Sequence, residues 1–280
     1  MKRRRISIIG IILVLLGIAT LIMALNRANT FETLINEARA DVVAADYEHV
    51  NSAYEGKLVG VSGKLTAEGI LSDNLIGIGR RTVMLRRVVE TYQWFQSCDD
   101  ACEYVKTWHE GLIDSKDFGP NHVNPSEQKY ESQDFIATDQ KFGAYILPKT
   151  LIQKLSYDTT LGPDEIAELY HGDLKIFNEY LTNSADPSNP AIGDYRISYQ
   201  YVKDKTITVI AQQKGDSFAE FRSSSKETFF EVDEGSETAE EFINRFAQNN
   251  KGINWVLAGI GIILVIFGAA LIYNSLKGRK

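Results

Sequence analysis

The two cysteines of the chain, Cys98 and Cys102, are the residues whose type and spacing most directly allow chemistry. A redox pair would usually be C-x-x-C at a helix start, and a zinc site would need two further ligands. The flanking residues 82–96 and 103–108 are rich in β-branched and aromatic types, which predicts two strands joined by a short turn. Reflecting the sequence about Asp100 places the cysteines opposite each other, at a separation that a disulfide can span. We therefore predict a structural disulfide that contributes about 2 kcal/mol.

A cluster of charged residues in the same hairpin is the second candidate site. It consists of Arg80, Arg81, Arg86, Arg87 and Glu90. Guanidinium groups bind anions well, so the cluster could receive an anionic ligand. The alternative is cross-strand pairing with the many carboxylates of the chain, which contributes only about 0–1 kcal/mol for each exposed pair. We expect pairing.

Known catalytic and metal-binding patterns are missing from the sequence. The four histidines have no metal-ligand spacing, and H-E-x-x-H, G-x-S-x-G and the P-loop do not occur. Residues 126–129 fit S-x-x-K and residues 72–74 spell S-D-N, two elements of penicillin-binding enzymes. In that family S-x-x-K comes first and K-T-G follows, whereas here the order is reversed and K-T-G is missing. We expect no enzyme, no metal site and no cofactor.

Two uncharged apolar runs, residues 6–25 and 253–273, define the organisation of the chain. Each has about the 20 residues that a helix needs to cross a bilayer. A cleaved signal peptide is the alternative for the first run, but the run is too long and no A-x-A site follows it. We predict transmembrane helices at 6–26 and 253–273, tails at 1–5 and 274–280, and a domain at 27–252.

The distribution of charge predicts the orientation of these helices. Seven of the 30 basic residues lie in the two tails, so both termini are expected in the cytoplasm. All 37 acidic residues lie between the tails, which gives that part a formal charge of −14. Such a domain is unsuited to nucleic acid, and outside the cytoplasm its disulfide can form. No glycosylation sequon occurs, so we expect a bacterial inner membrane, or an endomembrane if the source is eukaryotic.

Small residues recur every seven positions in both apolar runs. They are Gly10, Gly17 and Ala24 in the first, and Gly261, Gly268 and Ser275 in the second. Small residues on one face let membrane helices approach closely. These stripes either pair the two helices of one chain or join separate copies. The alternative explanation is composition, because glycine and alanine are common in membrane helices.

The domain between the helices is expected to be α+β, β-rich and built from antiparallel strands and short helices. An amphipathic helix should follow the first anchor, with Phe31, Leu34, Ile35 and Ala38 on one face. Residues 57–66 and 141–147 are each expected to form one strand, with an irregular loop around Asp73. Residues 194–202, 206–213 and 217–221 predict a three-stranded meander. A helix at 238–247, capped by Ser236, should lead into the second anchor.

Several motifs in order resemble the transmembrane protein 43 (LUMA) family. The strongest runs from Leu85, Arg86 and Arg87 through Val89, Glu90, Tyr92, Gln93 and Trp94. It is followed by Trp108, Ile113, Ser115, Lys116, Phe118, Asn124, Pro125 and Ser126. Near the end, Gly193, Asp194, Arg196 and Ser198 match, as do residues 208–211, Gln213, Gly215 and Asp216. Residues 56–59 and 62–63 also fit, so the resemblance covers most of residues 29–273.

The resemblance implies a membrane organiser with a large non-cytoplasmic domain and no established catalytic residues. The animal members lie in the endoplasmic reticulum and inner nuclear membrane, and associate with themselves, with emerin and with lamins. This chain departs from them by having one C-terminal membrane helix instead of several, so self-association transfers better than the nuclear partners.

We therefore expect a two-pass scaffold that forms a homo-oligomer in the lipid bilayer and contacts unidentified membrane proteins. The alternative is an envelope sensor or lipid-binding module, in which residues 80–87 face a closed apolar pocket.

Overall fold

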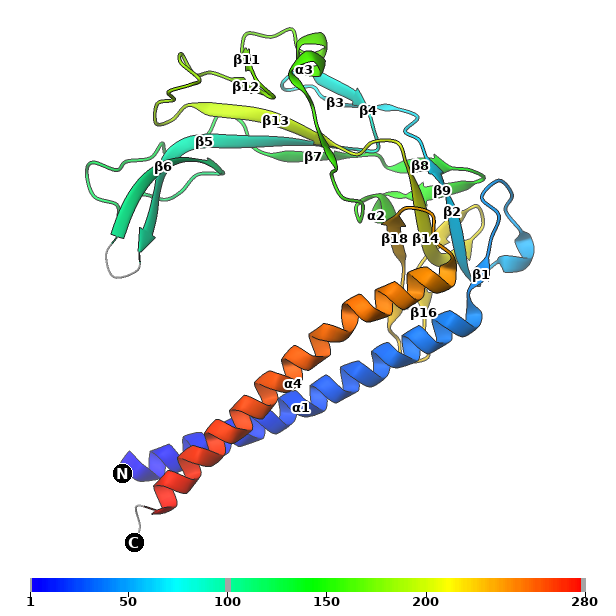
Figure 1. Ribbon diagram of the computed structural model, residues 1–280, viewed down its shortest axis with the longest axis vertical. Helices are drawn as coiled ribbons and strands as arrows, with labels where there is room; N and C mark the ends of the chain where they lie inside the picture. Colours follow the sequence, from blue (N-terminus) through cyan, green and yellow to red (C-terminus); the bar gives the residue numbers. More distant parts are fainter. Residues whose placement is uncertain (1, 99–101, 278–280) are drawn as a thin grey trace.

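Two long antiparallel helices carry the domain. The computed structural model describes residues 2–98 and 102–277, without the side chains of residues 2–7 and 251–254. Helix α1 spans Lys2–Asp41 and helix α4 spans Ala239–Lys277, and the two ends of the chain lie together at one end of the pair (Figure 1). Both helices are long and apolar enough to cross a membrane. Helix α1 continues without a break beyond the apolar run, so the amphipathic segment expected after the first anchor is the upper part of the same helix.

The first of two seven-stranded sheets lies on the upper ends of these helices, and we call it the base sheet. Its order is β1-β2-β14-β15-β9-β8, with β18 also paired to β14. The strands are β1 Val43–Ala44, β2 Leu58–Leu65, β8 Asp139–Phe142, β9 Tyr145–Pro148, β14 Lys205–Lys214, β15 Ser217–Ala219 and β18 Glu231–Glu234. Two pairs, β1–β2 and β15–β9, are parallel and the others are antiparallel.

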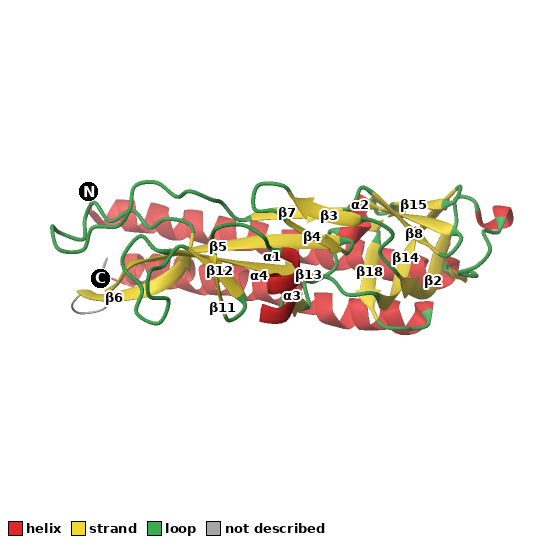
Figure 2. Cartoon of the chain, turned by 90° about the horizontal axis from the view of Figure 1, so that it is seen from above, coloured by secondary structure: helices red, strands yellow, loops and turns green. Residues whose placement is uncertain are grey.

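The second sheet, the arm sheet, extends over the helix pair along the long axis of the molecule (Figures 1 and 2). Its order is β11-β12-β13-β5-β6, with β10 paired to β13 and β7 to β5. The strands are β5 Met84–Cys98, β6 Cys102–Glu110, β7 Gln133–Ile136, β10 Thr159–Thr160, β11 Lys175–Phe177, β12 Tyr180–Thr182 and β13 Tyr195–Tyr201. All its pairings are antiparallel.

Short elements complete the fold. Two hairpins stand apart from the main sheets, β3 Ile70–Asp73 with β4 Ile78–Arg81, and β16 Phe221–Arg222 with β17 Thr228–Phe229. The short helices are the 3₁₀ turn Ser52–Tyr54, α2 Lys149–Ile152 and α3 Pro163–Leu169. The predicted class, a β-rich α+β domain between two apolar helices, is confirmed.

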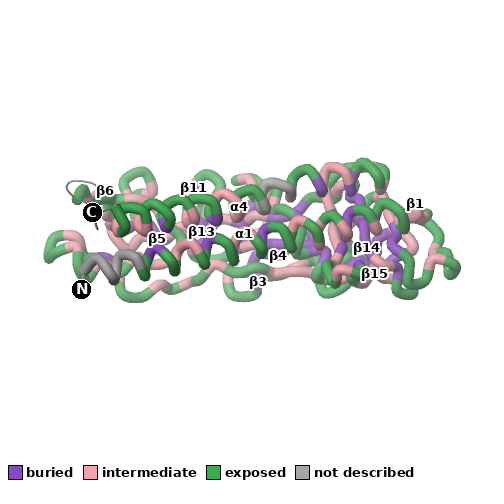
Figure 3. Tube along the Cα trace, turned by 90° about the horizontal axis from the view of Figure 1, so that it is seen from below, coloured by how far each residue is buried: buried purple, intermediate pink, exposed green. Residues whose placement is uncertain are grey.

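The apolar cores follow the two sheets. One core lies on the face of the base sheet away from the helices and contains Val59, Val209 and Leu147. A second joins the opposite face to the helices through Leu58, Ile210 and residues of α1 and α4 such as Ile35 and Ile243. The third supports one face of the arm sheet. Buried residues are dense around β14, whereas the far halves of both helices are mostly exposed (Figure 3).

The meander predicted at residues 194–221 is wrong in one of its two pairings. Strands β14 and β15 form the expected hairpin. Strand β13, however, pairs with β5 over seven residues, whereas β14 pairs with β2 over eight, so the two strands belong to different sheets. The three residues between them, Val202 to Asp204, carry the chain across. Alternation of side chains identifies a strand and its buried face, but it does not identify the partner strand.

Three local predictions also need correction. Residues 141–147 belong to two strands, β8 and β9, because Gly143 turns the chain with a positive φ of 60°. The loop expected around Asp73 contains the β3–β4 hairpin. Helix α4 is capped by Thr238 rather than Ser236: the Thr238 hydroxyl accepts from the Glu241 N–H at 3.2 Å, and the Glu241 carboxylate accepts in return from the Thr238 N–H at 3.0 Å.

Candidate functional site

The candidate site is a projecting part of the arm sheet, which we call the arm. It comprises residues 92–98 and 102–132, where β5 continues past the end of β13, pairs with β6 and leads into an irregular segment. In two views the free end of the arm lies toward the same end of the molecule as the chain termini (Figures 1 and 2). Most of the motif residues of the sequence lie on the arm or at its root.

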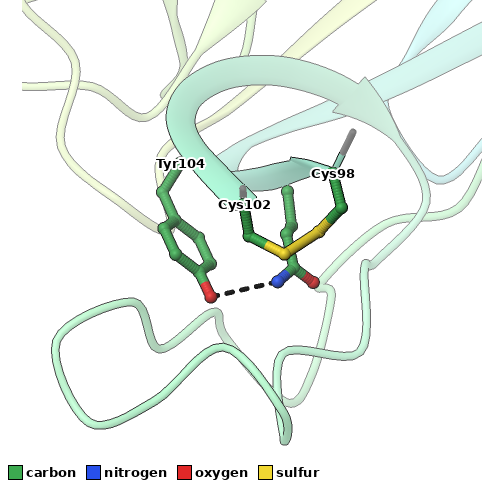
Figure 4. Close-up of a disulfide and its surroundings, with 4 residues drawn as sticks. Cys98, Cys102 and Tyr104 are labelled. Carbon is green, nitrogen blue, oxygen red and sulfur yellow. Dashed lines mark hydrogen bonds between the residues drawn. A yellow bond between two sulfur atoms is a disulfide. The ribbon is translucent and has the colours of Figure 1, made fainter. Parts of the chain in front are cut away.

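The hairpin of the arm has the register expected from the sequence. Cys98 pairs with Cys102, Phe95 with Val105, and Tyr92 with Trp108. A disulfide joins the two cysteines, and beside it the Gln96 amide donates to the Tyr104 hydroxyl at 3.0 Å (Figure 4). Asp100, the centre of the predicted reflection, lies outside the described residues.

Two buried amides attach the segment after β6 to the hairpin. The Gln93 side chain donates to the Gly111 carbonyl at 2.6 Å and accepts from the Ile113 N–H at 2.9 Å. The Asn124 side chain accepts from the Trp94 N–H at 2.7 Å and donates to the Trp94 carbonyl at 2.9 Å. Asn124 therefore continues the hydrogen-bond ladder of β5 where β13 has ended.

Aromatic contacts stiffen the arm further. The rings of Tyr104 and His122 stack at 4.0 Å, and His122 also meets the Trp94 ring edge-on at 4.6 Å. The ammonium of Lys106 lies 5.0 Å from the centre of the Trp94 ring. The residues in these contacts belong to none of the three cores, so this part of the arm depends on its own side chains for order.

The arginines of the sequence cluster are all engaged in ion pairs, which confirms the expected pairing. The pairs are Arg80–Glu165 at 2.5 Å, Arg81–Asp204 at 3.2 Å, Arg86–Glu110 at 2.9 Å and Arg87–Asp73 at 2.5 Å. Glu90 pairs with Arg196 at 2.7 Å. The guanidinium groups therefore face acids of the same chain rather than one common binding site.

One of these pairs differs from the expectation because it is buried. The side chains of Arg87 and Asp73 are only 3% and 2% exposed. The Tyr199 hydroxyl donates to the same Asp73 oxygen at 2.6 Å, and Arg87 Nε donates to the Glu131 carbonyl at 2.8 Å. Burial, followed by the adjacent Asp73 carboxylate, raises the pKa of Tyr199 far above its usual value. This network links β3, β5 and β13 at the root of the arm.

Little in the sequence indicates this network. Asp73 stood in an expected loop, and Tyr199 was one aromatic residue in an alternating strand. An aspartate two residues after the apolar pair Ile70 and Leu71 was the available signal, but its partner Arg87 lies 14 residues away on another strand. Asp73, Arg87 and Tyr199 are all buried, so the network is shielded from solvent and ties three strands together.

The carboxylate of Glu110 shows how the exposed ion pairs act. A hydrogen bond from Ser132 lowers the pKa of Glu110 below its usual value of 4.5, and Arg86 lowers it further. Likewise the backbone N–H of Gly162, with a smaller contribution from Arg80, lowers the pKa of Glu165. Both acids thus stay ionised and hold segments against the arm sheet near neutral pH.

The remaining motif residues form turns elsewhere in the domain. Gly193 adopts a positive φ of 94° just before β13, where the Asp194 carboxylate accepts from the Ser184 hydroxyl at 2.6 Å. Gly215 has a φ of 60° and forms the β14–β15 turn with Asp216. Ser115 accepts from the Asn124 N–H at 2.9 Å, and Pro125 follows in the same segment of the arm. The motif residues thus support the fold at separate places and do not form one site.

The small-residue stripes of the helices face each other within one chain. A Cβ added to Gly10 would lie 2.8 Å from the Gly268 carbonyl, and one added to Gly17 would lie 2.7 Å from the Gly261 carbonyl. Ala24 is buried and Ser275 is half-buried. Of the two arrangements that the sequence allowed, the structure therefore has the intramolecular one. The tails predicted at 1–5 and 274–280 lie partly outside the described residues, and their cytoplasmic location stays a prediction.

These features define a class: a protein in which a β-rich domain is inserted between two paired apolar helices, each long and apolar enough to cross a membrane. The sequence model described as transmembrane protein 43 matches residues 90–278. Transmembrane protein 43 of Homo sapiens and of Pongo abelii are each 28% identical over 96% of this chain and 73% of their own length. The Drosophila melanogaster homolog is 24% identical over 94% of the chain and 75% of its own length. The chain belongs to the transmembrane protein 43 family. No solved structure matches it.

Proposed function

We propose that the protein is a membrane-anchored scaffold that associates with itself through the arm and so organises assemblies of membrane proteins. The observation that carries the proposal is the free edge of β6, the last strand of the arm sheet. An unpaired strand edge is a template for pairing with another chain. The small-residue faces of the helices are already used within the chain, so contacts between copies need another surface.

The hairpin geometry shows which backbone groups β6 offers. The Cα atoms of the disulfide pair Cys98–Cys102 are 4.1 Å apart, close to the spacing of a non-hydrogen-bonded pair in an antiparallel ladder. By alternation, the N–H and C=O groups of Tyr104, Lys106 and Trp108 then point away from β5. No backbone hydrogen bond from the described residues reaches them. They form a row that a second strand can join.

The side chains beside this edge also suit association. Phe95 and Val105 lie opposite each other near the end of the hairpin and are 40% and 51% exposed. Two copies of β6 paired antiparallel about Val105 would place Tyr104 opposite Lys106 and keep Lys106 away from its own copy. Like charges directly opposite destabilise a sheet, so this register is preferred over one centred on Lys106. The pairing is isologous and yields a two-fold dimer.

The test is the variant Lys106→Pro. Proline removes the outward N–H of β6 but no hydrogen bond to β5, and such positions on edge strands tolerate proline. The wild-type chain is expected to dimerise in mild detergent with a concentration-dependent size, and Lys106→Pro is expected to stay monomeric. Lys106→Ala is the matched control and should still dimerise. A wild-type monomer at every concentration, or a dimer of Lys106→Pro, would contradict the proposal.

The membrane orientation belongs to the same proposal. The basic tails support cytoplasmic termini, and the disulfide supports an oxidising compartment for the domain, such as the outer side of a bacterial inner membrane or an endomembrane lumen. The alternative of a ligand pocket faced by residues 80–87 gains no support, because those arginines pair with acids. Labelling of a cysteine introduced at Ser275 from the cytoplasmic side only would support the orientation.

A further inference from the structure

A crevice between the two helices lies just below the base sheet and is independent of the arm. It has a volume of about 690 Å³ and is lined mainly by apolar residues of one stripe of α1, among them Leu21, Leu25, Ala28 and Ile35, with Ala247 and Ala258 of α4 opposite. Ligand pockets usually measure about 300–1,000 Å³. The crevice is thus large enough for a ligand, and its apolar lining suits a hydrocarbon chain.

The crevice crosses the predicted boundary of the bilayer. Leu21, Leu25 and Ala258 belong to the apolar runs, whereas Ile35 lies ten residues beyond Leu25 on the same straight helix. At 1.5 Å per residue the apolar stripe rises about 15 Å out of the hydrocarbon layer. Trp255, which is 79% exposed, lines the crevice near this boundary, where tryptophan is enriched in membrane proteins. The lower part of the crevice therefore lies at the level of the bilayer, where lipid is the molecule that can enter it.

The upper end of the crevice is polar. Arg39 lines it, and its Nε and Nη2 donate to the Asn244 side-chain oxygen at 3.0 and 2.8 Å. Its remaining nitrogen, Nη1, makes no hydrogen bond to the residues that the structure describes. Asn36 and Glu32 lie on the same rim. A fixed guanidinium with a free donor suits a phosphate, and the nearby carboxylate disfavours a headgroup of net negative charge.

We propose that this crevice binds one acyl chain of a zwitterionic phospholipid that is partly lifted out of the outer leaflet, with its phosphate at Arg39. The apolar stripe of α1 receives the chain, and the polar rim receives the headgroup. The lipid fills the space between α1 and α4 that Ala24, the last small residue of the α1 stripe, helps to line.

Photo-crosslinking tests the proposal with the full chain in phosphatidylcholine vesicles. A phosphatidylcholine with a diazirine on its acyl chain will label the lipid-facing residues of both spans in any case. The informative labels are those on Phe31 and Ile35, which lie above the hydrocarbon layer and line the crevice. We expect labelling there, and its absence with labels confined to residues 8–25 and 255–273 would overturn the proposal.

Variants separate a filled crevice from a misfolded chain. Ala28→Phe fills the crevice and should reduce labelling of Ile35 at least about five-fold, while labels in the spans remain. Ala19→Phe adds the same bulk on an exposed face of α1 and should leave the labelling unchanged. Arg39→Gln should give a smaller reduction. Unchanged labelling of Ile35 in Ala28→Phe, or crosslinks of Ile35 to a second protein chain, would overturn the proposal.

Discussion

The base sheet and the arm sheet have the same number of strands but differ in what covers them. Strand β14 of the base sheet is buried over Ile207–Ala211 without interruption, because one face packs on the helices and the other on the largest core. Strand β13 of the arm sheet alternates buried and half-buried residues along its whole length. The base sheet is therefore held from both sides, and the arm sheet from one side only.

This difference separates two ways of holding strands in place. Apolar burial on both faces stabilises the base sheet, and ion pairs such as Lys205–Glu234 between β14 and β18 add to it. The arm sheet relies on hydrogen-bonded side chains, ion pairs and a disulfide where apolar cover is missing. Four substitutions or conditions test this contrast, from the largest expected effect to the smallest.

The largest effect is expected from Arg87→Ala at the root of the arm. It leaves the buried Asp73 carboxylate without its cation, which typically costs about 3–5 kcal/mol. Unfolding by denaturant in mild detergent should show a large decrease in the free energy of unfolding. Hydrogen exchange should show that the loss of protection is greatest in β5 and β13. The control is Arg86→Ala, which removes a more exposed pair and should cost about 0–1 kcal/mol. An equal decrease in stability in both variants would contradict the larger contribution expected from the buried pair.

Leu58→Ala should produce a slightly smaller loss, centred on the base sheet. Leu58 is fully buried between the sheet and the helices, so a cavity there costs about 2–5 kcal/mol. The matched substitution on the arm, Phe95→Ala, should cost less, about 1 kcal/mol, because that residue is 40% exposed and lies outside the three cores. Thermal unfolding of both variants measures how much stability each substitution removes. A greater loss of stability for Phe95→Ala than for Leu58→Ala would mean that the arm has an apolar core of its own.

Replacing both cysteines by serine should cost about 2 kcal/mol at most, because the closed loop is short. The effect should be local, since the disulfide lies beyond the large cores. We expect faster hydrogen exchange of β6 and unchanged exchange of β14. Accelerated exchange in the base sheet would show that the two sheets unfold as one unit.

Acid should loosen the arm sheet before the base sheet. The folded-state pKa values of Glu110 and Glu165 are lowered below 4.5, so their contribution to stability is present above that pH and is lost as the pH falls through the lowered values. Hydrogen exchange measured at decreasing pH below about 4.5, corrected for intrinsic rates, should show earlier loss of protection in β6 and α3. Glu110→Gln should remove part of this pH dependence, and an unchanged profile would contradict the assignment.

Local patterns were enough to predict a large part of this architecture. The composition around Asp100 gave the register of the hairpin, because side chains on opposite strands mirror each other about the turn. The apolar runs predicted the helices, and Leu34, Ile35 and Ala38 were predicted to share one face of α1, which the structure places against the domain. These features depend on residues close together in the sequence.

The errors concern long-range pairing. The alternation in residues 194–202 marked a strand, but its partner β5 lies more than 100 residues earlier, and the next strand joined another sheet. The buried pair Arg87–Asp73 was missed because burial of a charge depends on what other segments cover it. Thr238 replaced Ser236 as cap because the Ser236 hydroxyl is engaged with Ser62, which no local pattern reveals.

The direct connection of the helices to the domain has a mechanical consequence. Helix α1 ends at Asp41, two residues before β1, and α4 begins five residues after β18 ends. Both helices also pack against the base sheet through Ile35 and Ile243, so we expect the domain, and with it the arm, to keep a fixed azimuth relative to the helix pair. Rotation of the pair within the membrane must sweep the arm through the same angle. If the arm binds a second copy as proposed, that contact would exert torque on the helices.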